Sequence, residues 1–145
     1  MTVRDNPITL VEGAIHNPSD SRHFMRISRP DHLITAVVAG TKIARSTNAI
    51  KVKEVGFDIY DPVIYFPRTD VEMEYLTKNK KSTHCPLKGD TEYFDATVAI
   101  GRIESAAWSY DRAIDVAKEI EGYIGFDVRH TVIVEYTDIT VSDSD

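Results

Sequence analysis

The sequence predicts a mainly β-fold, in which one compact and twisted antiparallel sheet carries a single amphipathic helix. Two observations lead to this class. Most segments between residues 31 and 136 are short runs of β-branched and aromatic residues that end at turn residues, whereas helical periodicity occurs only near residues 111–122. The 145 residues suffice for one domain with a core of its own.

Three segments of different composition follow one another along the chain. Residues 1–30 contain three prolines and a polar cluster, so we expect an irregular lead-in with one short strand at Ile8–Glu12. The β domain occupies residues 31–136. Residues 137–145 hold three Asp and no Lys or Arg, which predicts a flexible acidic tail.

Seven strands are expected in the β domain, each from a run of continuous or alternating apolar residues. They are Leu33–Ala39, Lys42–Arg45, Ala49–Val55, Pro62–Phe66, Thr91–Ile100, Ala106–Tyr110 and Thr131–Tyr136. In the third strand Ile50, Val52 and Glu54 share one face, because side chains alternate along a strand. This pattern places a carboxylate on the apolar side of the strand.

The single helix is expected just before the last strand. Asp111 is suited to cap its start, and Ile114, Ala117 and Ile120 recur at a three-residue interval with charged residues on the other side. Gly122 is a natural end for it. We expect this helix to cover one face or opening of the sheet.

Composition excludes several classes of function. The formal net charge of −6 argues against general nucleic-acid binding, which needs a basic face. The apolar runs are too short to span a bilayer and the N-terminus lacks the pattern of a signal peptide, so we expect a cytoplasmic protein with no nucleic-acid or membrane partner. The single cysteine excludes an intramolecular disulfide and a zinc site of two CxxC pairs, and we expect no cofactor.

Several known catalytic and binding motifs are absent, namely GxxxxGK[ST], GxGxxG, GxSxG and HExxH. His16, His23 and His32 are irregularly spaced in and just after the lead-in. We interpret them as solvated loop histidines, because that is the ordinary position of histidine, and we expect no metal site.

The most unusual stretch of the chain is residues 83–89, Thr-His-Cys-Pro-Leu-Lys-Gly, at the end of a lysine-rich segment. Nearby cations favour the thiolate form of Cys85, which is the form that acts as a nucleophile. Alternation along a strand makes Lys88 or Thr83 a better companion for this thiol than His84. The alternative is that Cys85 is a small buried residue in a turn.

Two carboxylates are further candidates. Asp70 follows a strand, where it either faces a pocket beside Arg68 or closes an Asx-type turn. Glu54 needs a partner on its apolar face. Arg45 or Lys88 would supply that partner, either in a structural ion pair or beside a catalytic acid.

Several blocks of the sequence, in this order, resemble the bacterial and fungal family called DUF427. They are Ala44-Arg45-Ser46, Glu54, Tyr65-Phe66-Pro67-Arg68-x-Asp70-Val71, Thr83-His84-Cys85-Pro86-Leu87-Lys88-Gly89, Tyr93-Phe94, Ala107-Trp108-Ser109-Tyr110 and Gly122-Tyr123-Ile124-x-Phe126. The Tyr-Phe-Pro-x-x-Asp block at residues 65–70 and the Thr-x-Cys-Pro-x-Lys-Gly block at residues 83–89 are together specific to this family. The match covers roughly residues 31–136.

The resemblance implies a small β-rich domain related to the Mss4-like, or β-tent, architecture with one helix. Many relatives of that fold bind zinc on two cysteine pairs, which this chain lacks. The family is sometimes labelled nucleotidyltransferase-like. Two-metal nucleotidyl transfer uses an Asp-x-Asp pair, and the spacing of Asp58 and Asp61 does not put two carboxylates on one strand face.

The first functional hypothesis is a domain that binds a small molecule, polar or anionic, in a pocket with aromatic walls and a charged rim. The proposed binding residues are Arg45, Glu54, Tyr65, Arg68, Thr83, His84, Tyr93, Trp108 and Tyr110, with Asp70 and Lys88 at the rim.

The second hypothesis is a transferase or hydrolase that uses Cys85 as its nucleophile. Lys88 and the preceding lysines would lower the pKa of the thiol, Asp70 or His84 would act as general base, and Thr83 or backbone amides would hold a developing oxyanion. A third hypothesis is a protein-interaction module such as a homodimer, which strand edges and exposed aromatic residues allow.

Overall fold

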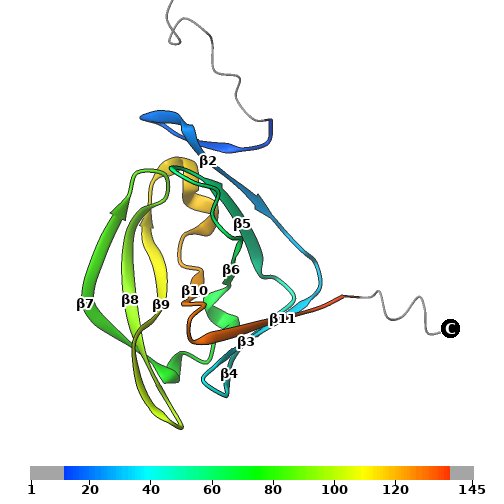
Figure 1. Cartoon of the computed structure of the whole chain (residues 1–145), viewed down its shortest axis with the longest axis vertical. Coiled ribbons are helices and arrows are strands. Elements are labelled where there is room, and N and C mark those ends of the chain that lie inside the picture. The colour runs from blue at the N-terminus through cyan, green and yellow to red at the C-terminus, as the bar shows by residue number, and fades with distance from the viewer. Residues whose placement is uncertain (1–11, 138–145) are drawn as a thin grey trace, which may run out of the picture.

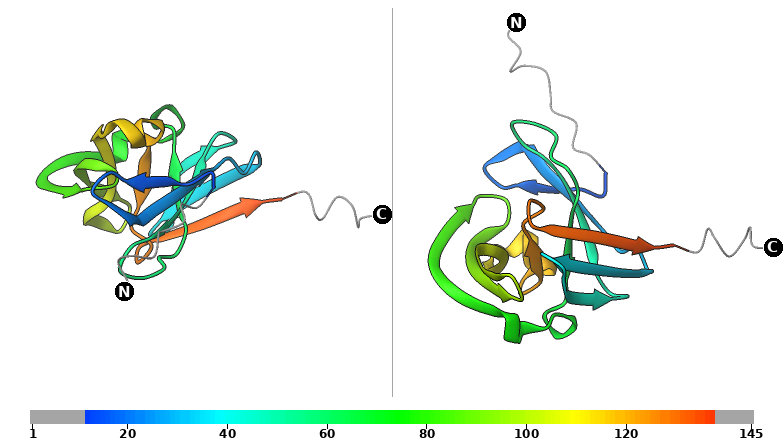
Figure 2. Two further views of the ribbon diagram at one scale, coloured as in Figure 1. Left: turned by 90° about the horizontal axis from the view of Figure 1, so that it is seen from above. Right: turned by 60° about the horizontal axis from the view of Figure 1, so that its bottom comes forward.

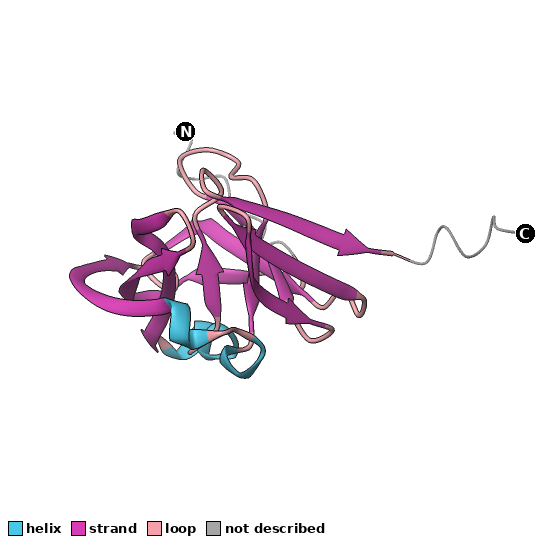
Figure 3. Cartoon of the chain, turned by 90° about the horizontal axis from the view of Figure 1, so that it is seen from below, coloured by secondary structure: helices cyan, strands magenta, loops and turns pink. Residues whose placement is uncertain are grey.

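Two antiparallel sheets make up the computed structural model, which describes residues 12–137 (Figure 1). One sheet has eight strands and the other three. Within the described residues the helical segments are 3-10 turns, and no α-helix of seven residues or more is present. Figure 3 shows how little of the chain these turns occupy. The prediction of a mainly β-fold with antiparallel pairing is confirmed.

The large sheet bends so that its two halves face each other. In spatial order its strands are β1 (Ile15–Asn17), β2 (Asp20–Ser28), β5 (Ile50–Val55), β6 (Val63–Phe66), β10 (Ile124–Phe126), β9 (Gly101–Ala113), β8 (Gly89–Val98) and β7 (Leu76–Cys85). Figure 1 shows β7, β8 and β9 on one side, β2 and β5 on the other, and β6 and β10 between them. Figure 2 shows the strong curvature of β7.

The small sheet packs against the large one and encloses the main core. Its strands are β3 (Leu33–Val38), β4 (Thr41–Ser46) and β11 (Thr131–Tyr136), in the order β11-β3-β4. Phe66 and Phe126 lie edge to face in this core, with ring centroids 5.8 Å apart. A second cluster, which includes Met25, Leu87 and Ile120, lies beneath the bent face of the large sheet.

The irregular lead-in expected for residues 1–30 is wrong for the part that the structure describes. β1 and β2 form an antiparallel hairpin, and β2 pairs with β5 over Phe24–Ser28. The prolines lie outside these strands, so they permit the hairpin. Most of the strand expected at Ile8–Glu12, and the acidic tail from residue 138 onward, lie outside the described residues.

The helix expected over residues 111–122 is also wrong. β9 runs on to Ala113, because it stays paired with β8 as far as Gly89, so Asp111 is a strand residue and caps nothing. Only Asp115–Ile120 is helical, as a 3-10 segment whose Ala117 and Ile120 are buried. An apolar residue at every third position matches the three residues per turn of a 3-10 helix.

No helix in the part of the chain that the structure describes is long and apolar enough to cross a membrane.

Candidate functional site

A cleft of about 1060 Å³ opens on the bent face of the large sheet. Side chains from β1, β2, the neighbouring strands β5 to β9, and the loops between them line it. Its lining includes His23, Glu54, Tyr65, Cys85, Lys88, Tyr93, Trp108 and Tyr110. The bend of the sheet thus gathers residues that are far apart in the sequence.

Aromatic side chains form the floor of this cleft. Gly125 of β10 lies directly between Tyr65 of β6 and Trp108 of β9 in the strand register. A Cβ atom on Gly125 would lie 2.9 Å from a ring atom of Trp108 and 3.0 Å from one of Tyr65, so glycine leaves the room that the two rings fill. The indole Nε1 of Trp108 donates a hydrogen bond of 3.2 Å to Tyr65 Oη, which fixes both rings.

An ion pair lies against this floor. Lys88 Nζ donates a hydrogen bond to Glu54 Oε1, and the two side chains are only 7% and 16% exposed. Burial by itself lowers the pKa of Lys88, but the nearby Tyr65 and Glu54 outweigh it and the pKa is raised. Burial likewise raises the pKa of Glu54, but Lys88 and His23 outweigh it and the pKa is lowered. Both groups are therefore charged at neutral pH.

A tight turn brings Lys88 and Cys85 to the cleft. The backbone N–H of Lys88 donates to the carbonyl of Cys85 at 3.2 Å, and the Lys88 carbonyl accepts from Ile114 at 3.0 Å. Gly89 follows with a φ of +121°. A Cβ atom there would lie 2.3 Å from the carbonyl oxygen of Arg112, so this position requires glycine.

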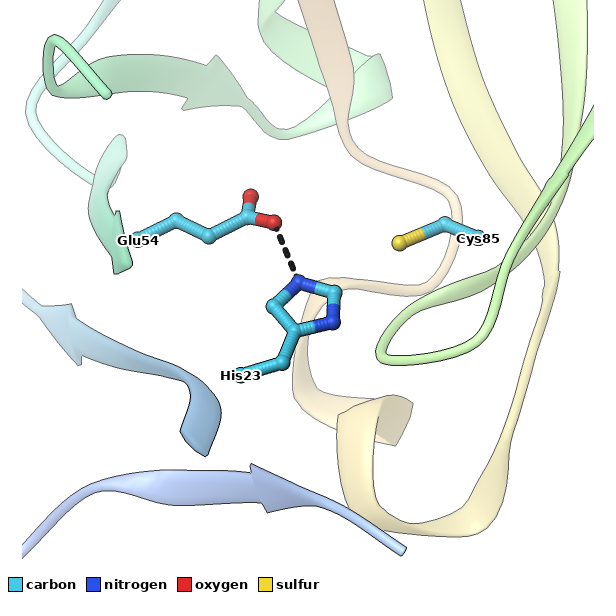
Figure 4. A group of neighbouring side chains, drawn as sticks. All are labelled: His23, Glu54 and Cys85. Carbon is cyan, nitrogen blue, oxygen red and sulfur yellow. Dashed lines mark hydrogen bonds and ion pairs between the residues drawn. The ribbon is translucent and has the colours of Figure 1, made fainter. Parts of the chain in front are cut away.

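His23 completes the site from β2. Its Nε2 lies 2.8 Å from Glu54 Oε2, and its Nδ1 lies 3.1 Å from the side-chain amide of Asn17. The Cys85 thiol lies in the same group, with one donor atom each of His23, Glu54 and Cys85 all within 4.8 Å of one another (Figure 4). These are the three types of side chain that bind transition metals.

Most of the sequence, from residue 26 to residue 143, matches the sequence profile of a domain of unknown function, DUF427. The chain belongs to the DUF427 family. No curated protein matches it. Glu54 and Cys85 lie inside the matched part of the DUF427 domain, whereas His23 lies just before it.

The description of His23 as a solvated loop residue is wrong, because it lies in a strand and its side chain is 19% exposed. Its position was nevertheless visible in the sequence of β2. His23, Met25 and Ile27 alternate with charged or aromatic neighbours, so they share one face of the strand. Met25 is fully buried and lies opposite Glu54 in the register, which directs this face toward the cleft.

Three of the predicted site residues of this DUF427 domain lie away from the cleft. Asp70 accepts a hydrogen bond of 2.5 Å from Ser46 Oγ in the turn that follows β6. Arg68 pairs with Glu92 at 3.0 Å on the surface, and Arg45 is exposed on β4. Lys88, rather than Arg45, is the partner of Glu54.

Of the remaining predicted residues, His84, Tyr93 and Tyr110 line the cleft, and Thr83 touches its rim only through Tyr93. Thr83 and Tyr93 share a hydrogen bond of 2.9 Å between their hydroxyl groups. His84 is exposed and its Nδ1 bonds to Asp90 at 2.8 Å, so it is engaged with Asp90 rather than with its neighbour Cys85. Tyr110 lies further in, with Lys88 Nζ 5.5 Å from the centre of its ring, and burial raises its pKa.

The charges that line the cleft largely neutralise one another. Four acidic and four basic side chains line it, apart from histidines: Asp20, Glu54, Asp61, Asp127, Arg22, Lys81, Lys88 and Arg129. Three of these pairs are joined by ion pairs, namely Asp20–Arg22, Glu54–Lys88 and Asp127–Arg129. The cleft is therefore polar and aromatic, without a strong net charge.

Proposed function

We propose that this DUF427 domain binds a small polar molecule that contains a flat ring, in the cleft of the large sheet. The observation that carries the proposal is the Glu54–Lys88 pair, which is buried against aromatic side chains at the edge of an open cleft. A charged pair in such a place gives a ligand one strong donor and one strong acceptor.

The aromatic residues supply the complementary apolar contact. The rings of Tyr65 and Trp108 are held by their mutual hydrogen bond and by close packing over Gly125, so little side-chain entropy is lost when a ligand binds to them. Tyr93 and Tyr110 extend this surface toward the rim. A ring of the ligand packs on these side chains while its polar groups reach the ion pair.

Trp108 is the only tryptophan of the chain and lines the cleft, so its fluorescence reports directly on this site. We would titrate the protein, in the presence of EDTA, with a panel of benzoates, indole acids, nicotinamide and nucleosides. Tyr93→Leu should weaken the saturable response at least several-fold, whereas Tyr136→Leu, on the exposed face of β11, should leave it unchanged. A panel that gives no saturable change, or equal affinity in both variants, would contradict the proposal.

A second candidate function is a transferase or hydrolase that uses Cys85. The observation in its favour is that the Cys85 thiol faces the cleft near Lys88 and His23. However, both ring nitrogens of His23 are already engaged, one with Glu54 and one with Asn17, so neither accepts the thiol proton in this arrangement. The geometry favours binding over this alternative.

The rate of alkylation of Cys85 by iodoacetamide separates the two functions. If Cys85 is a nucleophile, its alkylation rate should rise with pH around a midpoint well below the ordinary thiol pKa of about 8.5. Under the binding proposal, Cys85→Ser retains ligand affinity.

The Mss4-like classification, the cytoplasmic location and the homodimer stay predictions from the sequence.

A further inference from the structure

Three metal-binding side chains meet at one edge of the cleft although they come from distant parts of the chain. His23 is in β2, Glu54 in β5 and Cys85 at the end of β7. One nitrogen, one oxygen and the sulfur lie within 4.8 Å of one another, and Figure 4 shows the three side chains directed toward a common space. Among the described residues, this is the one place where three such donor atoms lie this close together.

We propose that His23, Glu54 and Cys85 bind one divalent transition metal of the Zn²⁺ type. Bonds of about 2.0–2.3 Å from zinc to N, O and S ligands place those ligand atoms about 3–4 Å apart in a tetrahedral site. Metal binding would widen the 2.8 Å distance between His23 Nε2 and Glu54 Oε2 and shorten the longer distances of this 4.8 Å group, through rotation of these half-buried side chains. Three protein ligands leave a fourth position, which faces the cleft and is open to a water molecule or a ligand atom.

The neighbouring residues already hold two of the three donors in place. Lys88 bonds to Glu54 Oε1 and leaves Oε2 turned toward His23. Asn17, which is only 5% exposed, holds the other side of the His23 ring. Contacts of this kind to the outer atoms of ligating side chains orient them and raise metal affinity.

The Lys88 ammonium, which bonds to Glu54, also sets the charge of the site. Zn²⁺ with one thiolate and one carboxylate is neutral overall, so Lys88 leaves one positive charge beside the open position. An anionic atom of a bound ligand is therefore favoured at that position.

Metal binding moves two protons. The Cys85 thiol loses its proton to solvent, and Nε2 of His23 binds the metal once the ring proton is carried, through solvent, on Nδ1 instead. The Asn17 side-chain amide then turns its oxygen toward Nδ1 and gives up its hydrogen bond of 2.8 Å from the Ser19 N–H. The metal replaces the hydrogen bond that now joins His23 and Glu54.

This site goes beyond the proposed ligand binding and does not depend on it, because the metal alone is the probe. We would titrate the reduced full-length protein with Co²⁺ and record its absorption spectrum. The expected result is one Co²⁺ per chain, with a thiolate-to-cobalt charge-transfer band that Zn²⁺ abolishes by displacement.

Variants identify the ligands. Cys85→Ser should abolish the charge-transfer band, and His23→Gln or Glu54→Gln should each weaken Zn²⁺ binding at least about 10-fold, since even outer contacts of a metal site are worth that much. His84→Gln is the matched control, because His84 is next to Cys85 in sequence but is bonded to Asp90 on the exposed side. Circular dichroism verifies that each variant is folded.

A band that survives Cys85→Ser, no band at all, or equal loss of affinity in His84→Gln and His23→Gln would overturn the proposal. The fluorescence titration in EDTA removes any metal, so a failure of the metal site and a failure of ligand binding give different results. Cys85 is half-buried, and its substitution by serine replaces only the sulfur atom with oxygen. This variant therefore still tests the proposal if the variants of His23 or Glu54 do not fold.

Discussion

Lys88 is the residue on which most of the site depends. Its ammonium group bonds to Glu54, lies over the ring of Tyr110 and is 7% exposed. The sequence led to this pair, because Glu54 on the apolar face of its strand required a cation and Lys88 was one of two candidates. It did not lead to His23, which reaches Glu54 only through the pairing of β2 with β5, 31 residues apart.

Lys88→Met should destabilise the domain, because it leaves the Glu54 carboxylate largely buried without its cation. Removing one partner of a buried pair costs roughly 3–5 kcal/mol, and we expect the low end since His23 still bonds to Glu54. Urea denaturation measures this loss. The double variant with Glu54→Gln should recover much of the stability, and a single variant as stable as the wild type would contradict the buried-pair description.

At the scale of elements, the turn from β7 to β8 and the glycine of β10 shape the cleft. β7 was not predicted, because it is rich in lysine and its side chains are mostly exposed. Its sequence therefore shows no alternation of apolar and polar residues. β10 escaped because it has only three residues. Strands β3, β4, β5, β6, β8, β9 and β11 were predicted because each contains a run of β-branched or aromatic residues, and all of them except β11 bury part of that run.

Gly89→Ala should destabilise the turn that carries Cys85 and Lys88. A residue with a Cβ atom loses of order 1–3 kcal/mol in this left-handed backbone conformation. The contact of 2.3 Å between that Cβ and the Arg112 carbonyl oxygen adds to the loss, because a backbone carbonyl cannot move aside as a side chain can. Gly40→Ala is the matched control, since its φ is +87° and nothing lies within 4 Å of its Cβ position. The difference between the losses of unfolding free energy in Gly89→Ala and Gly40→Ala measures the effect of the steric contact at Gly89. Equal losses in the two variants would contradict this contact.

Gly125→Ala should alter the floor of the cleft rather than its strands. The added methyl group meets ring atoms of Trp108 and Tyr65 at 2.9–3.0 Å, so these side chains must shift. We expect a change in the emission maximum of Trp108 and weaker ligand binding. Unchanged fluorescence would show that the rings do not pack over this glycine.

At the scale of the whole molecule, ionised carboxylates contribute to the pH dependence of stability. The pKa is lowered for six carboxyl groups of the described chain: Asp20, Glu54, Asp95, Glu121, Asp127 and Glu135. Each stabilises the fold above its ordinary pKa of 3.8 or 4.5, and this contribution is lost as the pH falls through the lowered value in the folded state.

The unfolding free energy should therefore decrease as the pH falls below about 4.5. Urea denaturation between about pH 6 and about pH 3 measures the slope. Glu54→Gln should flatten it, because one of the shifted groups is removed. A stability that is independent of pH in this window would contradict the lowered pKa values.

The order of the strands in space was beyond the sequence. Periodicity gives a strand its faces but not its neighbours, and β6, β10 and β9 are adjacent although β10 follows β9 and β6 lies far before them. The three-residue interval of Ile114, Ala117 and Ile120 does reflect a helical segment, but this segment is a short 3-10 helix and not the longer amphipathic helix that was predicted.

The most direct test of the proposed function compares two lysine variants. The strongest binder from the fluorescence panel is titrated into the wild type, Lys88→Met and Lys42→Met, each verified as folded by circular dichroism. Lys42 is exposed on β4 of the small sheet, away from the cleft. We predict that affinity falls at least 10-fold in Lys88→Met and is unchanged in Lys42→Met. The expected loss corresponds to one hydrogen bond to a charged group, which contributes about 1.5–3 kcal/mol. Equal affinity in all three proteins would contradict the claim that this ion pair is the ligand's anchor.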